Sequence, residues 1–495
     1  MKYFKTKTLA ALFAANVFSA LTLGIYYVVC KDNAFFNLSA AIWLVCIVSN
    51  MVVCVKIRKS AFLRTIAMIA PPVLFMLSAM LGTNSKSPVM GIIVEVLAFI
   101  YFAFSAFHTY YLDSEKYPVV EVKRPKAVGI IFYAIYYVIV TAVFLTYYYF
   151  TLIRAELKMS SAISMMSGFS YFLPVLALSV SIGFVRRLEL RGNKVASKAV
   201  ALIAAFSVLG SLIPVAALPN TSENADKAYV KVFGGENEKF VYSVPQMMFG
   251  RTESGYVEKR NVTYYVMNYD GKEYELKYDM FKSNGENAPS PVIIRLHGSG
   301  GDKGFNLQLI DQSLASEGYT VFDVNYGNEK VKPTNDELAV NVCRLLDYLY
   351  ENREELNIDV NNIILSGTSR GGKIALKTAV AWTENVLDLK DKVTVKGSVL
   401  VWSVMNDVFE RDGKERIVSL EELTSDLPPV LFVDTTNDGS VQGGILLEGV
   451  LRTLGVKAAN VELRYAMHGA NNNLYGGWGQ LTEYYILRFA DDMTR

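Results

Sequence analysis

Charged residues and histidines are scarce in this sequence. Only 19% of the 495 residues are charged and three are histidines, so chemistry that depends on histidine has few candidate residues. The net charge of +2 is too small to indicate a nucleic-acid-binding protein, and no cluster of Lys and Arg with interleaved aromatic residues occurs. We therefore expect no nucleic acid among the partners.

Cysteines are also few. The four are Cys30, Cys46, Cys54 and Cys343, and the first three lie in or beside apolar runs. Neither a disulfide framework nor a set of metal ligands can be built from this spacing. The sequence predicts no metal site and no cofactor.

Apolar residues, in contrast, make up 52% of the chain, and long apolar runs fill its first 220 residues. Seven such runs cover 8–30, 33–55, 65–85, 87–112, 127–153, 159–185 and 199–218. Each has roughly 20 residues or more, which is enough for a helix to cross a hydrocarbon layer of about 30 Å. Buried helices of a soluble protein would be shorter and amphipathic. Residues 1–220 are therefore predicted to form an α-helical membrane domain of about seven transmembrane helices.

The charges between these runs predict the orientation of the domain. With the N-terminus in the cytoplasm, the inner segments carry sixteen basic residues and the outer loops four. This bias follows the positive-inside rule and favours an odd number of spans. The polar half of the chain is then expected outside the cytoplasm. Residues 1–30 also resemble a signal peptide, but no small-residue cleavage site follows, so a retained helix is favoured.

The second half of the chain has a different pattern. Residues 221–260 are mixed and polar and are interpreted as a linker and the beginning of the outer domain. In 261–495, two β-rich runs flank an Asp-Gly turn, which is a strong hairpin signal. Short apolar strands follow at 292–296, 320–324, 362–365, 398–402, 430–433 and 461–465, with helical stretches between them. This alternation predicts an α/β fold whose mostly parallel sheet has helices on both faces and an antiparallel edge.

One motif in this half carries a nucleophile. The segment 364–372 is a β run, the pattern G-x-S-x-G and the start of an amphipathic helix, with Ser369 at the centre. Small residues at Gly367 and Gly371 permit a tight strand-to-helix turn that exposes the serine hydroxyl at a helix N-terminus. The alternative is a glycine-rich turn with a solvated serine, but the strand before it and the helix after it favour the nucleophile.

A second glycine-rich segment, His297-Gly298-Ser299-Gly300-Gly301, follows an earlier strand. Glycines there let backbone N–H groups approach a substrate oxygen, which suits an oxyanion hole formed by Gly298 and Ser299. The backbone N–H of Arg370, directly after the serine, would be a further donor. A loop without a function is the alternative.

The general base and its acidic partner should follow the serine in the order Ser, Asp, His. His468 is the one histidine downstream of Ser369, so we expect it to accept the serine proton. For the acid, Asp438 lies in the loop after a strand and is the preferred candidate. Asp434, at the strand end, and Asp407 are the alternatives.

With these motifs in place, residues from about 261 to 495 resemble the α/β-hydrolase superfamily. They resemble specifically its H-G-G-G esterase branch, which includes hormone-sensitive-lipase-like and feruloyl/acetylxylan-esterase-like enzymes. The resemblance is carried by Lys277–Phe281, His297–Gly301, Val324–Tyr326, Gly367–Gly372, Asp438 and His468. It does not extend to the membrane half.

Two residues depart from the pattern of that branch. Ser299 replaces a glycine of the oxyanion motif, which keeps the backbone donor. Arg370 replaces a small residue after the nucleophile, and its side chain would narrow the site or attract an anionic acyl or leaving group. Tyr475 and Trp478 follow His468 and either line the substrate cleft or pack within the last helix.

Two functional hypotheses follow. In the first, the chain is a membrane-anchored extracytoplasmic serine esterase that cleaves a small-molecule, glycan or lipid ester through an acyl-enzyme, with acyltransferase or peptidase chemistry as variants. In the second, it is a membrane sensor or transporter whose outer domain binds ligands with little turnover. The presence of Ser, Asp and His together favours the first.

Overall fold

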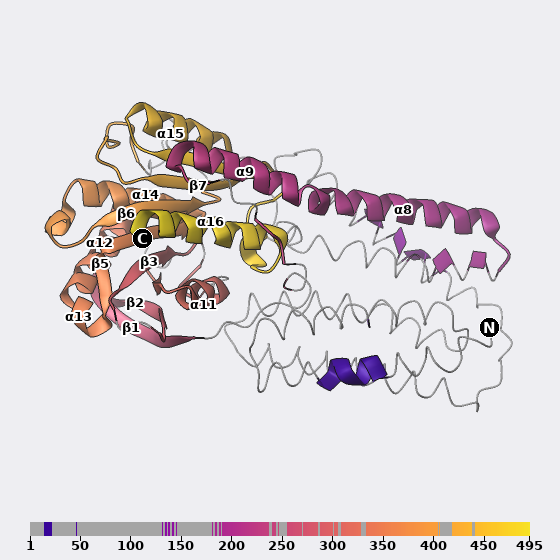
Figure 1. The fold of residues 1–495 in the computed structure, drawn as a ribbon, viewed down its shortest axis with the longest axis horizontal. Coiled ribbons are helices and arrows are strands. Elements are labelled where there is room, and N and C mark those ends of the chain that lie inside the picture. Colours follow the sequence, from indigo (N-terminus) through magenta and orange to yellow (C-terminus); the bar gives the residue numbers. More distant parts are fainter. Residues whose placement is uncertain are drawn as a thin grey trace. The chain divides into compact units, whose positions relative to one another are not determined.

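A computed structural model of the chain contains two compact units (Figure 1). The first comprises 1–149, 169–216 and 243–252, and the second comprises 150–168, 217–242 and 253–495. The structure describes residues 14–21, 46, separate positions between 131 and 189, 191–236, 240–243, 246, 255–269, 271–285, 288–299, 301–304, 308–327, 333–403, 405, 418–437 and 441–495.

In the first unit, the longest described helix is α8 (Lys194–Ala216), which covers the seventh predicted span. Large apolar side chains on this helix are exposed, among them Leu202, Phe206 and Leu209. The stretch Lys194–Phe233 is 40 residues long and is, by length and composition, the one helix among the described residues that is able to cross a membrane. The other six predicted spans lie largely or wholly outside the described residues.

The second unit is built around an eight-stranded sheet in the order β1-β2-β4-β3-β5-β6-β7-β8. The strands are β1 (Tyr256–Tyr269), β2 (Lys272–Ser283), β3 (Ser290–Leu296), β4 (Thr320–Val324), β5 (Ile358–Thr368), β6 (Val395–Val401), β7 (Val430–Thr435) and β8 (Ala458–Leu463). β2 is antiparallel to both neighbours, β1 and β4, and all other pairs are parallel. The predicted mostly parallel sheet with an antiparallel edge is confirmed.

The predicted hairpin is also present. Tyr269 of β1 pairs with Lys272 of β2, so a loop of two residues joins the strands. Its second residue, Gly271, has a φ of +70°, a conformation that glycine adopts without steric cost. On its other side β2 pairs with β4, and this antiparallel pairing joins the hairpin to the parallel part of the sheet.

Helices cover both faces of the sheet (Figure 1). They are α11 (Gln308–Ser316), α12 (Asn335–Glu351), α13 (Arg353–Leu356), α14 (Arg370–Thr383), α15 (Val441–Thr453) and α16 (Gly477–Thr494). A capping box begins α12, because Thr334 Oγ1 accepts from the Glu337 N–H while the Glu337 carboxylate accepts from the Thr334 N–H.

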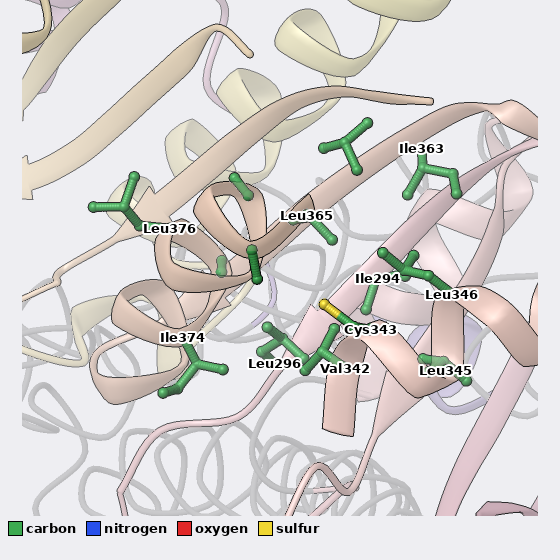
Figure 2. Close-up of a cluster of buried hydrophobic side chains, with 14 of the residues drawn as sticks. Ile294, Leu296, Val342, Cys343, Leu345, Leu346, Ile363, Leu365, Ile374 and Leu376 are labelled. Atoms are coloured by element: carbon green, nitrogen blue, oxygen red, sulfur yellow. The ribbon is translucent and has the colours of Figure 1, made fainter. Parts of the chain in front are cut away.

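One face of the sheet and the helices α12, α14 and α15 form the largest apolar core. Figure 2 shows part of it, with Ile294 and Leu296 of β3 near Val342 and Cys343 of α12. Each fully buried aliphatic side chain of this kind contributes about 1.5–3 kcal/mol. The core holds the carboxyl ends of β3 and β5 in fixed register, because Leu296 pairs with Gly367.

The polar segment that follows α8 differs from the prediction. Residues of the predicted linker form most of α9 (Leu218–Phe233), which packs within the second unit. The ring of Tyr229 is fully buried 5.8 Å from the ring of Tyr485 on α16, and its hydroxyl donates to the Asp492 carboxylate at 2.7 Å. The buried pair Asp226–Arg488 joins the same two helices. The predicted linker and entry segment therefore contains a helix, whose buried face is polar and aromatic and so resembles a solvated segment in sequence.

Candidate active site

The nucleophile candidate sits on a sharp turn between β5 and α14. Ser369 follows the last residue of β5 and precedes the first residue of α14, with φ 57° and ψ −121°. This backbone conformation is sparsely populated by residues other than glycine and costs of order 1–3 kcal/mol. The N–H of Ser369 donates to the Val401 carbonyl at 2.8 Å, which fixes the turn against β6.

The two glycines of the motif are required by close backbone contacts. A Cβ on Gly367 would lie 2.2 Å from the carbonyl carbon of Gly371, and a Cβ on Gly371 would lie 2.1 Å from the Leu296 carbonyl oxygen. Neither contact is sterically allowed. The turn therefore depends on close packing of α14 against both β5 and β3, as the motif predicts.

The structure brings the predicted base to the predicted nucleophile. His468 lies in the loop after β8, and its Nε2 is 3.1 Å from Ser369 Oγ. This distance lies within hydrogen-bonding range for a base that accepts a serine proton. The residue after it, Gly469, has a φ of +80°, so the chain turns sharply beyond the histidine.

The predicted acid, Asp438, lies outside the described residues, and so does the alternative Asp407. The other alternative, Asp434, is fully buried on β7, and its Oδ2 accepts from Asn460 Nδ2 at 3.1 Å. A Cβ added to Gly444 of α15 would be 2.1 Å from the same oxygen. The Asp434 carboxylate thus faces α15 and β8.

The predicted oxyanion loop lies against the nucleophile. It begins after Leu296, the last residue of β3. A Cβ on Gly298 would be 3.4 Å from Ser369 Cβ and 4.0 Å from Ser369 Oγ, so the Gly298 backbone approaches the serine closely. Ser299, the next residue, is exposed. The Gly301 N–H donates to the Gly298 carbonyl at 3.2 Å and closes a turn within the loop.

Side chains outside the predicted site hold this loop in place. The Tyr326 hydroxyl donates to the His297 carbonyl at 2.5 Å, and the two rings stack 4.4 Å apart. Further along the loop, Lys303 Nζ lies 2.6 Å from the carboxylate of Asp279 on β2. Tyr326 and Asp279 fall within segments that carry the family resemblance, which is the one sequence signal that pointed to them.

Buried charges support the same loop from beneath. Asp323 of β4 accepts a hydrogen bond from the Gly304 N–H, and Arg295 of β3 lies 3.5 Å from the Asp311 carboxylate on α11. Arg295 also donates to Ser366 Oγ at 2.7 Å. Burial raises the pKa of Asp323 to about 7 against the opposing effect of the Gly304 hydrogen bond. The loop is therefore hydrogen-bonded to a buried carboxylate of the sheet, that of Asp323.

The side chain of Arg370 lies at the start of α14 and is half-buried. Its guanidinium is 3.5 Å from Asn335 Oδ1, at the first residue of α12. Burial raises the pKa of the Tyr326 hydroxyl, and the positive charge of Arg370 opposes that rise. Arg370 is therefore near both α12 and the tyrosine that holds the oxyanion loop.

The two residues considered for the cleft have different surroundings. Trp478 is 1% exposed, and its indole N–H donates to the Arg464 carbonyl at 3.0 Å. It packs in the interior at the start of α16 and does not line an open cleft. Tyr475 is half-buried, and its carbonyl accepts from Gln480 Nε2 at 2.7 Å. In the part of the chain that the structure describes, no cluster of side chains is suited to holding a metal ion.

Residues 278–410 match the BD-FAE family model, and this match supports a carboxylic ester hydrolase. No curated protein matches the chain.

Solved esterase structures are similar to part of the chain. A bacterial heroin esterase is 21% identical, with 49% of this chain and 85% of that chain covered and a TM-score of 0.41. Esterases of Rhizomucor miehei are 18% identical, with 49% and 85% covered and a TM-score of 0.41. Esterase B of Lactobacillus rhamnosis is 17% identical, with 57% and 94% covered and a TM-score of 0.41. Because these TM-scores are low, the fold assignment rests on the order and direction of the strands described above.

Proposed function

We propose that this chain is a membrane-anchored serine hydrolase that cleaves carboxylic esters through an acyl-enzyme intermediate. The observation that carries the proposal is the distance of 3.1 Å between Ser369 Oγ and His468 Nε2 on a strained strand-to-helix turn. The glycines of this turn lie against neighbouring backbone, where a Cβ would clash, and this close packing permits the sharp turn that presents the serine hydroxyl. A serine in an ordinary solvated turn has no need of these features.

The proposed reaction has two halves. His468 takes the proton from Ser369 as Oγ bonds to the ester carbonyl carbon, and the carbonyl oxygen becomes an oxyanion. Backbone N–H groups of Gly298, Ser299 and Arg370 stabilise that charge. The intermediate then collapses, the bond to the alcohol oxygen breaks, and His468 protonates the leaving alcohol. Water repeats the sequence and releases the acid, which restores the serine.

Asp438 is proposed as the residue that orients His468. It follows β7 by three positions, in the loop where this arrangement of strands requires the acid. The contacts of Asp434 favour this choice, because its carboxylate is directed to Asn460 and α15. An acid at Asp438 would hold the imidazole tautomer whose Nε2 accepts the serine proton.

The membrane attachment and the location are part of the same proposal. The exposed apolar side chains of α8 suit a lipid environment, and the excess of basic residues in alternate loops favours a cytoplasmic N-terminus and an extracytoplasmic hydrolase unit. The substrate is then a small-molecule, glycan or lipid ester that is accessible from outside the cytoplasm.

A fluorophosphonate probe applied to the full chain in membranes tests the chemistry. We expect covalent labelling at Ser369, loss of labelling in Ser369→Ala, and labelling slowed at least about 100-fold in His468→Ala. Asp438→Asn should slow it more than Asp434→Asn. A folded wild-type chain in which Ser369 does not react would exclude the esterase and favour a ligand-binding membrane sensor. A reporter fused after Asn220 that is active only in the cytoplasm would contradict the proposed topology.

A further inference from the structure

Arg370 contributes two separate groups to the site. Its backbone N–H is an oxyanion donor in the proposed mechanism, and its side chain extends from the residue that directly follows the nucleophile. The guanidinium has one hydrogen-bonding contact among the described residues, the side-chain oxygen of Asn335 at 3.5 Å. That distance is at the long limit for a hydrogen bond, and the acceptor is a neutral amide.

The carboxylates that lie next to Asn335 are bound to other groups. Asp336 is 2.8 Å from Lys377 Nζ. Glu337 accepts from the Thr334 N–H at 2.7 Å and completes the capping box of α12. Within the residues that the structure describes, no carboxylate lies at ion-pair distance from Arg370. The first turn of α14 also lacks an acidic residue.

The surroundings of the guanidinium make an unpaired charge unfavourable. Arg370 is half-buried, so part of its hydration is lost, and no carboxylate of the described residues replaces it. The N-terminus of α14 adds partial positive charge at the same place. On the side of the oxyanion loop, the neighbouring hydroxyl of Tyr326 is bound to the His297 carbonyl at 2.5 Å. An anion from outside the protein would therefore be stabilised next to this guanidinium.

We propose that the Arg370 side chain selects ester substrates that carry an anionic group, a carboxylate or a phosphate, close to the scissile carbonyl. The inference rests on the proposed esterase function and adds a substrate class to it. The planar guanidinium presents parallel N–H donors that match the two oxygens of a carboxylate or phosphate. The anionic group belongs either to the acyl part or to the alcohol part of the ester, and the two sources call for different probe substrates.

Two pairs of esters separate these sources. For the acyl part, the purified full chain is assayed with p-nitrophenyl butyrate, which is neutral, and with p-nitrophenyl hemisuccinate, which is anionic. For the alcohol part, it is assayed with phenyl acetate, which is neutral, and with 3-carboxyphenyl acetate, which is anionic. In each pair the quantity of interest is kcat/KM for the anionic ester divided by kcat/KM for the neutral ester.

Arg370→Gln removes the charge and Arg370→Lys keeps it without the planar fork. We expect Arg370→Gln to lower the anionic-to-neutral ratio by about 10- to 100-fold in at least one pair, through a higher KM for the anionic ester. Arg370→Lys should give an intermediate ratio. Arg452→Gln is the matched control because Arg452 lies on α15 and is half exposed beside Glu448. Its ratio should equal that of the wild type.

The outcomes distinguish this inference from the proposed function. If the wild type hydrolyses none of the four esters and Ser369 resists the fluorophosphonate, the esterase proposal itself fails. If the neutral esters are hydrolysed and both ratios are unchanged in Arg370→Gln and Arg370→Lys, the role of Arg370 is refuted while the esterase stands. Fluorophosphonate labelling of both Arg370 variants shows that each is folded.

Discussion

The backbone of Ser369 predicts that the turn at the proposed nucleophile lowers the stability of the hydrolase unit. Its φ of 57° with ψ −121° belongs to a region that glycine occupies readily and other residues do not. Replacement of Ser369 by Gly should relieve this strain, which is of order 1–3 kcal/mol. Glycine also makes the unfolded chain more flexible, which costs about 0.5–1 kcal/mol. The expected net gain is about 1 kcal/mol.

Ser369→Ala is the reference, because both variants lose the contact with His468 but only alanine keeps a Cβ at the strained position. Ser369→Gly should therefore be the more stable of the two by about 1 kcal/mol, which corresponds to roughly 2–4 °C in Tm for a unit of this size. Both variants lack the proposed nucleophile, so we expect no contribution from turnover to the comparison of stabilities.

The assay is urea unfolding of the full chain in detergent, followed by tryptophan fluorescence. Three of the four tryptophans, Trp382, Trp402 and Trp478, lie in the hydrolase unit, so the signal reports mainly on that unit. The matched control is Ser316, the last residue of α11, whose φ is not positive. There the order should be reversed, with Gly less stable than Ala by up to about 1 kcal/mol. If Gly and Ala at Ser369 are equal, or Ala is more stable, the strain argument is wrong.

Three further predictions concern packing and buried charges in the hydrolase unit. Gly371→Ala should destabilise the unit by about 3 kcal/mol or more, because the new Cβ would clash with the backbone of β3. Gly449→Ala is the control, since its Cβ would lie in open space, and urea titrations of both variants measure the difference. The pKa of Asp323 is about 7 in the folded chain against an ordinary 3.8, so the folded chain binds the Asp323 proton more tightly than the unfolded chain does. This binding stabilises the folded chain fully below pH 3.8, and the stabilisation is lost as the pH rises to about 7. The free energy of unfolding of the wild type relative to Asp323→Asn should therefore fall by about 4 kcal/mol between pH 4 and pH 8, and a constant difference would contradict this. Arg488→Leu should cost about 3 kcal/mol because it leaves Asp226 buried without its partner, and adding Asp226→Asn should restore part of the loss in the same titration.

The strands and the nucleophile turn were predictable because their signals are local. Each buried strand is a short apolar run, and Gly367 and Gly371 flank Ser369 within one pentapeptide. His468 was identified because few histidines exist and the order of residues in the resembling enzymes leaves one candidate. Ser369 and His468 follow the carboxyl ends of β5 and β8, strands of the parallel part of one sheet, so both residues lie at the same edge of that sheet.

The long-range contacts were not predictable in the same way. Lys303 binds Asp279 across a gap in sequence that spans β3, and no periodic pattern connects the two residues. The burial of Trp478 was equally open, because the same residue type lines clefts and fills cores. In both cases the partner comes from a distant part of the chain.

The sequence by itself determined the class of the fold, the turn at Ser369 and the order of the candidate catalytic residues along the chain. These features depend on strand periodicity and backbone sterics, which act over a few neighbouring residues. Tertiary structure alone decided what surrounds them. It docked the polar helix α9 onto α16, placed the Gly298 backbone against Ser369, and left the Arg370 guanidinium without a carboxylate among the described residues. These arrangements depend on which distant groups meet when the sheet forms, and the free energy of a buried polar group is set by those partners.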